Sequence, residues 1–373
     1  MNHSIRPGQP MLDTEGKRIQ AHGGSIWYDK KEKVFYFYGE NKEFTDGKNG
    51  IWTWGVRAYR SKDFYNWEDC GLIVLPEPED RTSSLNPYTA MLDRPHILFN
   101  EKTGKFVCWC KIMNYDQTQT ELVLTSDSFL GPYTVVRDHL RPLGMDAGDF
   151  DLAIGEDGKG YYLFEKVHTE TIIAELTDDY TDVNGKYSSH FPHPYPPYVR
   201  EATAHFFYKN RHYLLTSGTT GYYPNPSEVA VSDNWHGPYT VLGDPCPEDR
   251  SQTSYHSQVS SVFRFPGKKN LYVAVADRWV PDCMDIPYPF YADYIEAMFS
   301  GKVPKEQLDA VYLDLAKKHG LSKEQFARFS GPRNTSLADY VWLPLRFEEP
   351  SEQYPDGMVF MDWKDEWKIE DFD

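Results

Sequence analysis

The strongest constraint on the fold is a pattern that occurs five times along the chain. Each copy has an apolar stretch, a short polar turn and a second stretch rich in aromatic residues. Apolar side chains alternate on both sides of the turn, as expected for the two strands of a β-hairpin. The copies are HGGSIWYDKKEKVFYFYGE from His22, DRPHILFNEKTGKFVCW from Asp93, DFDLAIGEDGKGYYLFE from Asp149, REATAHFFYKNRHYLLTS from Arg200 and SQVSSVFRFPGKKNLYVAVAD from Ser257.

A second recurring unit follows several of the hairpins. SKDFYNWEDCGLIV from Ser61, SDSFLGPYTVV from Ser126 and SDNWHGPYTVL from Ser232 each begin at a polar corner and continue into a further strand. A hairpin with outer strands, repeated five times, predicts an all-β fold, a five-bladed β-propeller. One blade alone is too small to be stable, so the blades must close around an axis, and we predict one catalytic domain over residues 1–373.

Residues 285–333 break the β-pattern. Their apolar residues recur at helical spacing, which predicts a short α-helical insertion in the propeller. The expected helices are 291–299, 304–320 and a third that begins at a capping box formed by Ser322 and Gln325. Strand character returns from Tyr340 and again from Met358, and these segments are expected to complete the last blade.

The charge of the chain excludes several classes of partner. There are 39 Lys and Arg residues against 56 Asp and Glu, a net charge of −17, which disfavours nucleic acid and anionic membrane surfaces. No stretch is long and apolar enough for a membrane helix, and Met1 to Pro10 does not resemble a signal peptide. With five cysteines, an odd number, the chain is expected to carry free thiols in the cytoplasm; a trimmed leader would instead indicate a secreted or periplasmic protein.

Polar residues at the hairpin starts are the candidates for chemistry. The inner strands of a propeller line its axis, so these starts are expected to converge at one mouth of the tunnel. Asp93, Asp149 and Glu201 then meet in one pocket, where burial and like charges raise a carboxyl pKa. Gln258 and Glu40 are directed to the same mouth. Four of these residues also have an ordinary interpretation: Glu201 as a surface ion pair, Asp149 as a turn cap, Gln258 as a polar residue of a sheet and Glu40 as a solvated residue.

In order along the chain, the segments AHGGSIWYD, FYFYGE, DRPHILFNEKTGKFVCW, GDFDLAIGEDGKGYYLFE, YVREATAHFFYKNRHYLLTSGTTGYYPNP, YHSQVSSVF and YVWLPLRF resemble the blades of glycoside hydrolase family 43. The resemblance is strongest to the exo-β-1,3-galactanase-like subgroup and covers nearly everything except the insertion. It implies a five-bladed propeller and hydrolysis with inversion. By this resemblance Glu201 is the general acid, Asp149 tunes its pKa, and Asp93 contacts sugar.

The resemblance leaves the water-activating group open. Most members carry an Asp base in the first blade, where this chain has His22, Gly23 and Gly24. The galactanase-like subgroup also lacks that Asp, and there a glutamine at the place of Gln258 is proposed to hold the water. A neutral amide is a poor base, so Gln258 must act by positioning water or through an unusual tautomer, and Glu40 is a second candidate.

Further substrate contacts are predicted around the same mouth: His22, Arg94, Tyr222, Tyr223, Arg278 and Trp279. Tyr222 and Tyr223 follow a Thr-Thr-Gly where the galactanase-like members have Trp after Thr-Gly, and they can still serve as stacking platforms. The insertion is expected either to cover one mouth and enforce exo action or to form a contact between two copies of the chain.

Other chemistries have less support in the sequence. There is no Gly-x-Ser-x-Gly elbow for an esterase and no His-Glu-x-x-His or paired Cys-x-x-Cys for zinc, so no metal site is predicted. No cofactor is expected, with calcium at the propeller axis as a secondary candidate and His256 beside it. The favoured function is an inverting exo-glycosidase that releases a terminal sugar from β-1,3-galactan or arabinogalactan-type oligosaccharides. The alternatives are an α-L-arabinofuranosidase, a β-galactofuranosidase or a non-catalytic carbohydrate-binding propeller.

Overall fold

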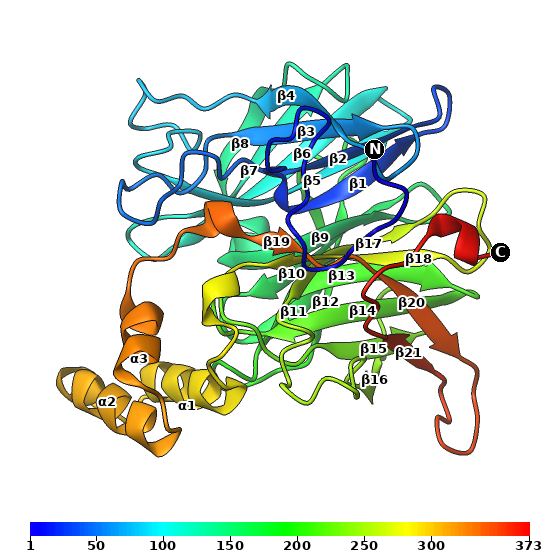
Figure 1. Cartoon of the computed structure of the whole chain (residues 1–373). Helices are drawn as coiled ribbons and strands as arrows, with labels where there is room; N and C mark the ends of the chain where they lie inside the picture. Colours follow the sequence, from blue (N-terminus) through cyan, green and yellow to red (C-terminus); the bar gives the residue numbers. More distant parts are fainter.

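Five antiparallel sheets dominate the computed structural model, which describes all 373 residues (Figure 1). Within each sheet the strands follow in chain order, so each sheet is one blade. Blades 1 and 2 contain β1 (His22–Asp29), β2 (Val34–Glu40), β3 (Val56–Ser61), β4 (Glu68–Val74), β5 (Met91–Asn100), β6 (Lys105–Met113), β7 (Gln119–Ser126) and β8 (Thr134–Leu140). Blades 3 and 4 contain β9 (Ala147–Ile154), β10 (Gly160–Lys166), β11 (Glu170–Leu176), β12 (Val183–His190), β13 (Arg200–Tyr208), β14 (Arg211–Gly218), β15 (Glu228–Ser232) and β16 (Thr240–Gly243).

Blade 5 is interrupted by helices. Its strands are β17 (Gln258–Arg264), β18 (Tyr272–Arg278), β19 (Asp339–Tyr340), β20 (Leu343–Glu348) and β21 (Met358–Met361). Between β18 and β19 lie α1 (Tyr288–Phe299), α2 (Leu308–Lys318) and α3 (Lys323–Ser330), which sit together beside the propeller in Figure 1. The capping box of Ser322 and Gln325 begins α3 as predicted. The prediction of an all-β, five-bladed propeller with a short helical insertion is confirmed.

The ring closes through side chains. The inner strands β1, β5, β9, β13 and β17 contact one another in turn, and β17 contacts β1. An aromatic cluster joins the last blade to the first, with Phe35 and Phe37 packed against Phe263 and Trp342. A bridge between Ile5 and Trp367 ties the two ends of the chain together at the same place. Closure therefore depends on burying this cluster, since no N-terminal strand enters the sheet of blade 5.

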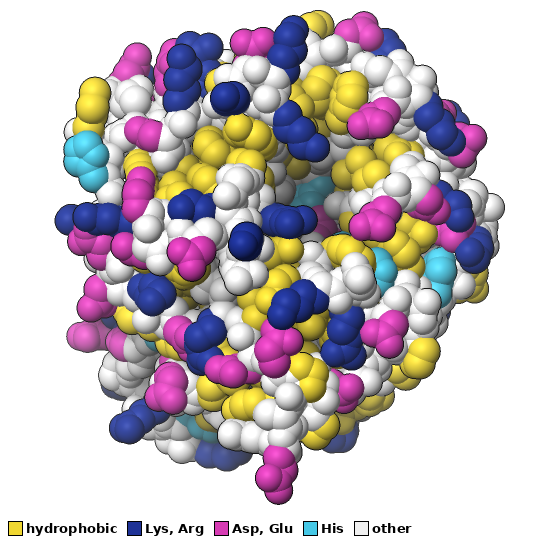
Figure 2. All heavy atoms as spheres, turned by 90° about the vertical axis from the view of Figure 1, so that its right-hand side faces the viewer, with side chains coloured by type: hydrophobic (Ala, Val, Ile, Leu, Met, Phe, Trp, Pro, Cys, Tyr) yellow, Lys and Arg dark blue, Asp and Glu magenta, His cyan; other side chains and the backbone are white.

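The outer surface carries both signs of charge. Figure 2 shows Lys and Arg interspersed with Asp and Glu over the face turned away from the helices. On that face the negative net charge is spread out and does not form one patch. None of the helices is both long and apolar enough to cross a membrane.

The contact between blades 3 and 4 is built differently from the others. Its apolar cluster has only four buried residues. Trp235 of blade 4 stacks on Tyr161 of blade 3 with ring centroids 3.8 Å apart, and His205 and His212 of blade 4 pack on Trp235 at 4.4 and 4.3 Å. The backbone N–H of His205 also donates to Asp151 of blade 3 over 2.7 Å. Burial lowers the pKa of His205 to about 3 and that of His212 to about 4, so both stay neutral in the folded protein well below neutral pH.

This contact predicts a loss of stability in mild acid. Unfolded histidine titrates near pH 6.5, so below that pH the unfolded chain binds more protons than the folded one, and the free energy of unfolding falls until pH reaches about 3 to 4. Urea unfolding at pH 7, 5 and 4 measures this fall. In His212→Gln the free energy of unfolding should fall less between pH 7 and pH 4 than in the parent. In His3→Gln, the control at an exposed site, it should fall as much as in the parent. Equal pH dependence in His212→Gln and the parent would contradict this interpretation.

Candidate active site

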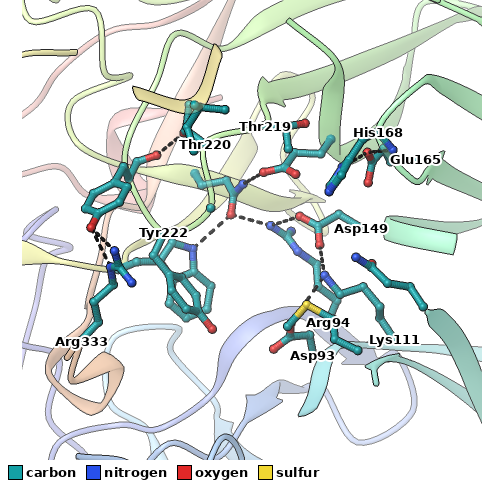
Figure 3. A pocket seen from close by; sticks show the side chains of 18 of the residues that line it. Asp93, Arg94, Lys111, Asp149, Glu165, His168, Thr219, Thr220, Tyr222 and Arg333 are labelled. Atoms are coloured by element: carbon teal, nitrogen blue, oxygen red, sulfur yellow. Dashed lines mark hydrogen bonds and ion pairs between the residues drawn. The ribbon is translucent and has the colours of Figure 1, made fainter. Parts of the chain in front are cut away.

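A cavity of about 400 Å³ receives side chains from all five blades and from α1. Each blade contributes one central residue, so the cavity lies where the inner ends of the blades meet. These residues are Glu40, Asp93, Asp149, Glu201 and Gln258, and all five are buried. The structure therefore brings together the three predicted catalytic residues and, among these five, two of the predicted sugar contacts. Figure 3 shows the cavity, with Asp93 and Asp149 labelled.

β-Bulges near the starts of the inner strands help to aim these side chains. The pairing register shifts after His22 in β1, after Asp93 in β5 and after Glu201 in β13. Arg94 and Ala202 have positive φ angles of 51° and 50°, which cost roughly 1–3 kcal/mol each in a non-glycine residue. In a regular strand Asp93 and Arg94 would point to opposite faces, but across the bulge both reach the cavity.

Glu201 has the properties of a proton donor. Burial raises the pKa of its carboxyl well above the usual value, and the nearby charges of Asp149 and Glu165 raise it further. Gln258 Nε2 donates a hydrogen bond to Glu201 Oε1 over 3.2 Å. Because Oε1 accepts this bond, the acidic proton of a protonated Glu201 resides on Oε2.

Asp149 is held as an anion. Lys111 Nζ lies 2.7 Å from one of its oxygens and Arg94 Nη2 lies 3.0 Å from the other (Figure 3). Burial alone would raise the pKa of Asp149, but the two cations outweigh burial and lower it to about 2. Asp149 and Glu201 are thus two neighbouring carboxyl groups with pKa values driven apart, the arrangement that separates an acid from a permanent anion.

The orientation of the Gln258 amide follows from its partners. Its oxygen accepts hydrogen bonds from Arg94 Nη2 (2.6 Å) and Trp279 Nε1 (3.1 Å), which can only donate. Its nitrogen therefore faces Glu201 and the hydroxyl of Ser217, 3.0 Å away. All polar atoms of the amide are engaged, so a water or substrate hydroxyl must replace one of these partners to bind Gln258.

Glu40 lies where the first blade lacks a side chain. A Cβ built on Gly23 would come within 2.4 Å of Glu40 Oε1, so the Glu40 carboxylate occupies the space in front of this glycine. Burial raises the pKa of Glu40 to about 8, with the Lys42 ion pair (2.8 Å) opposing and Asp93 reinforcing the rise. The Arg94 backbone N–H also donates to Glu40 Oε1, over 3.0 Å.

Asp93 is surrounded by donors. Trp52 Nε1 donates to it over 2.6 Å, and Lys111 and Lys42 approach it at 3.5 and 3.8 Å. Hydrogen bonds and opposite-charge pairs of this kind fix a buried side chain in place.

Tyr222 and Trp279, both predicted from the sequence, line the same cavity, with their rings 5.1 Å apart. Tyr223 borders it but packs into the core of the insertion, where its hydroxyl donates to the Phe329 carbonyl over 2.7 Å. These rings and the donors around Asp93 supply the apolar and polar contacts that a sugar needs.

Two residues predicted as sugar contacts do not line this cavity. His22 is fully buried, and its Nδ1 pairs with Asp277 over 2.8 Å. It precedes the bulge at Gly23, which leaves the His22 side chain inside the blade packing. Arg278 lies outside as well, with its guanidinium donating to the carbonyls of Gly8 and Tyr255 over 3.3 and 2.9 Å. Both side chains reinforce the wall and do not reach the cavity.

Several cavity residues were not identified from the sequence. Lys42, Trp52, Lys111, Glu165, His168 and Arg333 lie in or near the cavity, on second strands, loops or the end of the insertion. The hairpin-start criterion considers only first strands, and therefore misses them. Lys111 had one usable signal, since it is a lone cation in the apolar run FVCWCKIM.

No group of three or more His, Cys, Asp or Glu side chains is arranged to hold a metal ion. The histidines near the axis pair with single carboxylates, His22 with Asp277 and His96 with Asp151, each at 2.8 Å. No step of the chemistry below is routed through a metal.

A propeller whose blades converge on a protonated carboxyl, an ionised carboxyl and stacking aromatics defines a carbohydrate-active enzyme of the glycoside hydrolase class. Residues 19–282 match the family model described as glycosyl hydrolases family 43. The chain belongs to this family and is a glycoside hydrolase. No curated protein sequence matched the chain significantly.

Solved structures of family 43 proteins show the same fold. A β-1,3-galactosidase superposes with a TM-score of 0.75 at 26% identity, covering 100% of this chain and 65% of its own. A second β-1,3-galactosidase, solved with galactodeoxynojirimycin, gives 0.74 at 23% identity, covering 98% and 100%. An exo-β-1,3-galactanase from Clostridium thermocellum gives 0.71 at 25% identity, covering 98% and 66%. The chain thus spans just under two thirds of the first of these relatives.

The electrostatics of the site predict how its pH dependence responds to Asp149→Asn. Removing this anion takes away a charge that raises the Glu201 pKa and frees Lys111 and Arg94, which lower it. The Glu201 pKa should fall by roughly 1–3 units, and the alkaline limb of kcat/KM should move to lower pH by that amount. A pH–rate profile on an aryl glycoside measures the shift. An unmoved or raised alkaline limb would show that Asp149 does not set the pKa of Glu201.

Proposed function

We propose that this protein is an inverting exo-glycosidase that releases terminal galactose from β-1,3-galactan or arabinogalactan-type oligosaccharides. The observation that carries the proposal is the pairing of a protonated Glu201 with an anionic Asp149 at the meeting point of the five blades. The likeness to β-1,3-galactosidase structures supports the choice of sugar and linkage.

In the proposed reaction Glu201 gives its proton to the glycosidic oxygen. The bond from the anomeric carbon to that oxygen then breaks, and the leaving group departs as an alcohol. A water attacks the anomeric carbon from the opposite face of the ring, so the configuration inverts. The water loses one proton to a base, and Glu201 is reprotonated from solvent before the next cycle.

Asp149 prepares Glu201 for this step. Its negative charge opposes ionisation of Glu201, so the acid still holds its proton at neutral pH. After the proton has left, Lys111 and Arg94 lie close to both carboxylates and stabilise the product state. The same cations prevent Asp149 from competing for the proton.

Gln258 serves as a positioning residue in this proposal. Its amide N–H fixes Glu201 Oε1 as an acceptor, which directs the proton on Oε2 toward a bound glycosidic oxygen. When substrate enters, the amide can exchange Ser217 for the attacking water and hold it. An amide has little driving force for removing a proton, so a second group is needed as the base.

Glu40 is the candidate for that base. It is the one cavity carboxylate in front of the glycine that replaces the first-blade Asp. A pKa of about 8 is close to the range in which a general base is both available and effective. Its ion pair with Lys42 favours the ionised form that can accept a proton from water.

The walls of the cavity suit a galactose ring. Asp93, held by Trp52, and Glu40 line the cavity and offer acceptors to ring hydroxyls, and Lys111 and Arg94 offer donors. The rings of Tyr222 and Trp279 offer an apolar face for stacking. A sugar ring needs both kinds of contact at once, because one face of the ring is apolar and its edges are polar.

The first test of this function is Glu201→Gln. Gln is nearly isosteric but cannot donate an acidic proton, so turnover of β-1,3-galactobiose should fall by roughly 10²- to 10⁴-fold. Hydrolysis is measured on a panel of p-nitrophenyl pyranosides and furanosides and on natural oligosaccharides. If the wild-type enzyme hydrolyses only α-L-arabinofuranosides or β-galactofuranosides, the substrate is a furanoside and not a galactopyranoside. Wild-type inactivity on the whole panel, with sugar binding intact, would leave only the binding function.

The second test separates Gln258 from Glu40. Gln258→Ala should lower kcat by roughly 10²-fold, and azide should not restore it, since no anion is missing. Glu40→Ala should lower kcat at least as much, and azide should restore part of it by attacking directly and giving the α-galactosyl azide. Product anomers are assigned by NMR. If azide restores activity to Gln258→Ala and not to Glu40→Ala, Gln258 and not Glu40 is the residue that activates the water.

A further inference from the structure

Helix α1 presents an apolar face to the cavity. Tyr294, Ile295, Met298 and Phe299 all line it. Positions 294 and 298, 295 and 298, and 295 and 299 are three or four residues apart, so these side chains are neighbours on one side of the helix. The insertion therefore contributes a wall of the active site.

Tyr294 also packs against the core of the insertion, but Met298 and Phe299 are not part of that core. The insertion has its own buried cluster, in which Phe290, Tyr291 and Phe329 are at most 2% exposed. Met298 and Phe299 are each 40% exposed although both are large and apolar. Exposed apolar side chains gathered in a concave site are typical of a surface that binds a ligand.

Contacts with the propeller hold α1 on the side of the general acid. The Phe299 ring meets the His168 ring edge-on at 5.1 Å, and His168 Nδ1 lies 2.9 Å from Glu165, whose charge acts on Glu201. The Tyr198 hydroxyl donates to Glu296 on α1 over 2.9 Å, and Tyr198 precedes Glu201 by only three residues. The helix is thus fixed beside the residue that delivers the proton.

The position relative to Glu201 identifies what binds there. A general acid protonates the oxygen of the departing group, so that group must lie on the acid's side of the scissile bond. We propose that the α1 face, together with Gln119 and His168, forms the leaving-group subsite, and that it takes a second hexopyranose ring. This inference rests on the proposed exo-glycosidase function, whose acid is Glu201.

The chemistry of the subsite matches a sugar ring. Phe299 and Tyr294 offer rings for the apolar face of a pyranose. On the propeller side Gln119 Oε1 is buried and has no hydrogen-bond partner, so it is an acceptor available to a hydroxyl. A plain aryl group would satisfy the apolar wall but would leave this acceptor unpaired.

The experiment compares binding of one sugar ring with binding of two. In the Glu201→Gln background, which does not turn over, calorimetry measures the Kd of galactose and of β-1,3-galactobiose. Adding Phe299→Ala should raise the Kd of galactobiose roughly 3- to 10-fold, the effect expected from losing one aromatic contact, and should leave the Kd of galactose unchanged. Gln119→Ala should have the same selective effect. Leu313→Ala, at a half-exposed site on α2 outside the cavity, is the matched control and should change neither Kd.

The possible results separate this inference from the proposed function. If Phe299→Ala and Gln119→Ala leave galactobiose binding unchanged, or weaken both sugars equally, the subsite is overturned. Selective weakening of p-nitrophenyl β-galactoside, with galactobiose unaffected, would also overturn it by replacing the second sugar with an aromatic group. If the Glu201→Gln variant binds neither galactose nor galactobiose, the proposed substrate is wrong. The role of α1 is then tested in the same way with the monosaccharide and disaccharide of the sugar that the hydrolysis panel identifies.

Discussion

The site depends on Arg94, a buried cation that connects four of the blades. Its guanidinium pairs with Asp149 of blade 3 and donates to Gln258 of blade 5, while its backbone N–H holds Glu40 of blade 1. Arg94 itself belongs to blade 2 and adopts a positive φ at a bulge. The strain at Arg94 is offset by these interactions. Its Nη2 atom donates to the Asp149 carboxylate and to the Gln258 amide oxygen at once, so one guanidinium orients both side chains.

Charge balance around Arg94 explains why one carboxyl keeps a proton. The buried cations Arg94, Lys42 and Lys111 face the four carboxyl groups Glu40, Asp93, Asp149 and Glu201. A fourth negative charge would be uncompensated in a poorly solvated space, which is costly. Asp149 touches two of the cations, and Glu40, whose pKa burial raises to about 8, still pairs with Lys42. Glu201 forms no ion pair with any of the cations, so it holds its proton most tightly. Because Asp149 has ion-pair partners and Glu201 has none, Glu201 is the carboxyl group suited to act as a general acid.

The sequence predicted the parts of this arrangement that repeat. Five hairpins predicted five blades, and their first strands predicted Asp93, Asp149, Glu201 and Gln258 at one place. Lys42, Trp52 and Lys111 could not be predicted in this way, because each comes from a second strand or loop and is specified by contacts across blades. The bulges were also invisible, and they explain why Arg94 enters the cavity while His22 pairs with Asp277 inside the wall.

The insertion shows where a repeated fold leaves room for a specific function. In the proposed function the propeller supplies the acid, its tuning partner and the sugar pocket from successive blades, so these elements are constrained by closure of the ring. The insertion attaches to the propeller through Tyr223 and Trp279 on one side and through His168 and Tyr198 on the other. Between these attachments a partly exposed position on the face of α1, such as Met298, can vary without disturbing a blade. A change in the group that leaves is therefore easier to accommodate there than a change in the sugar that is released.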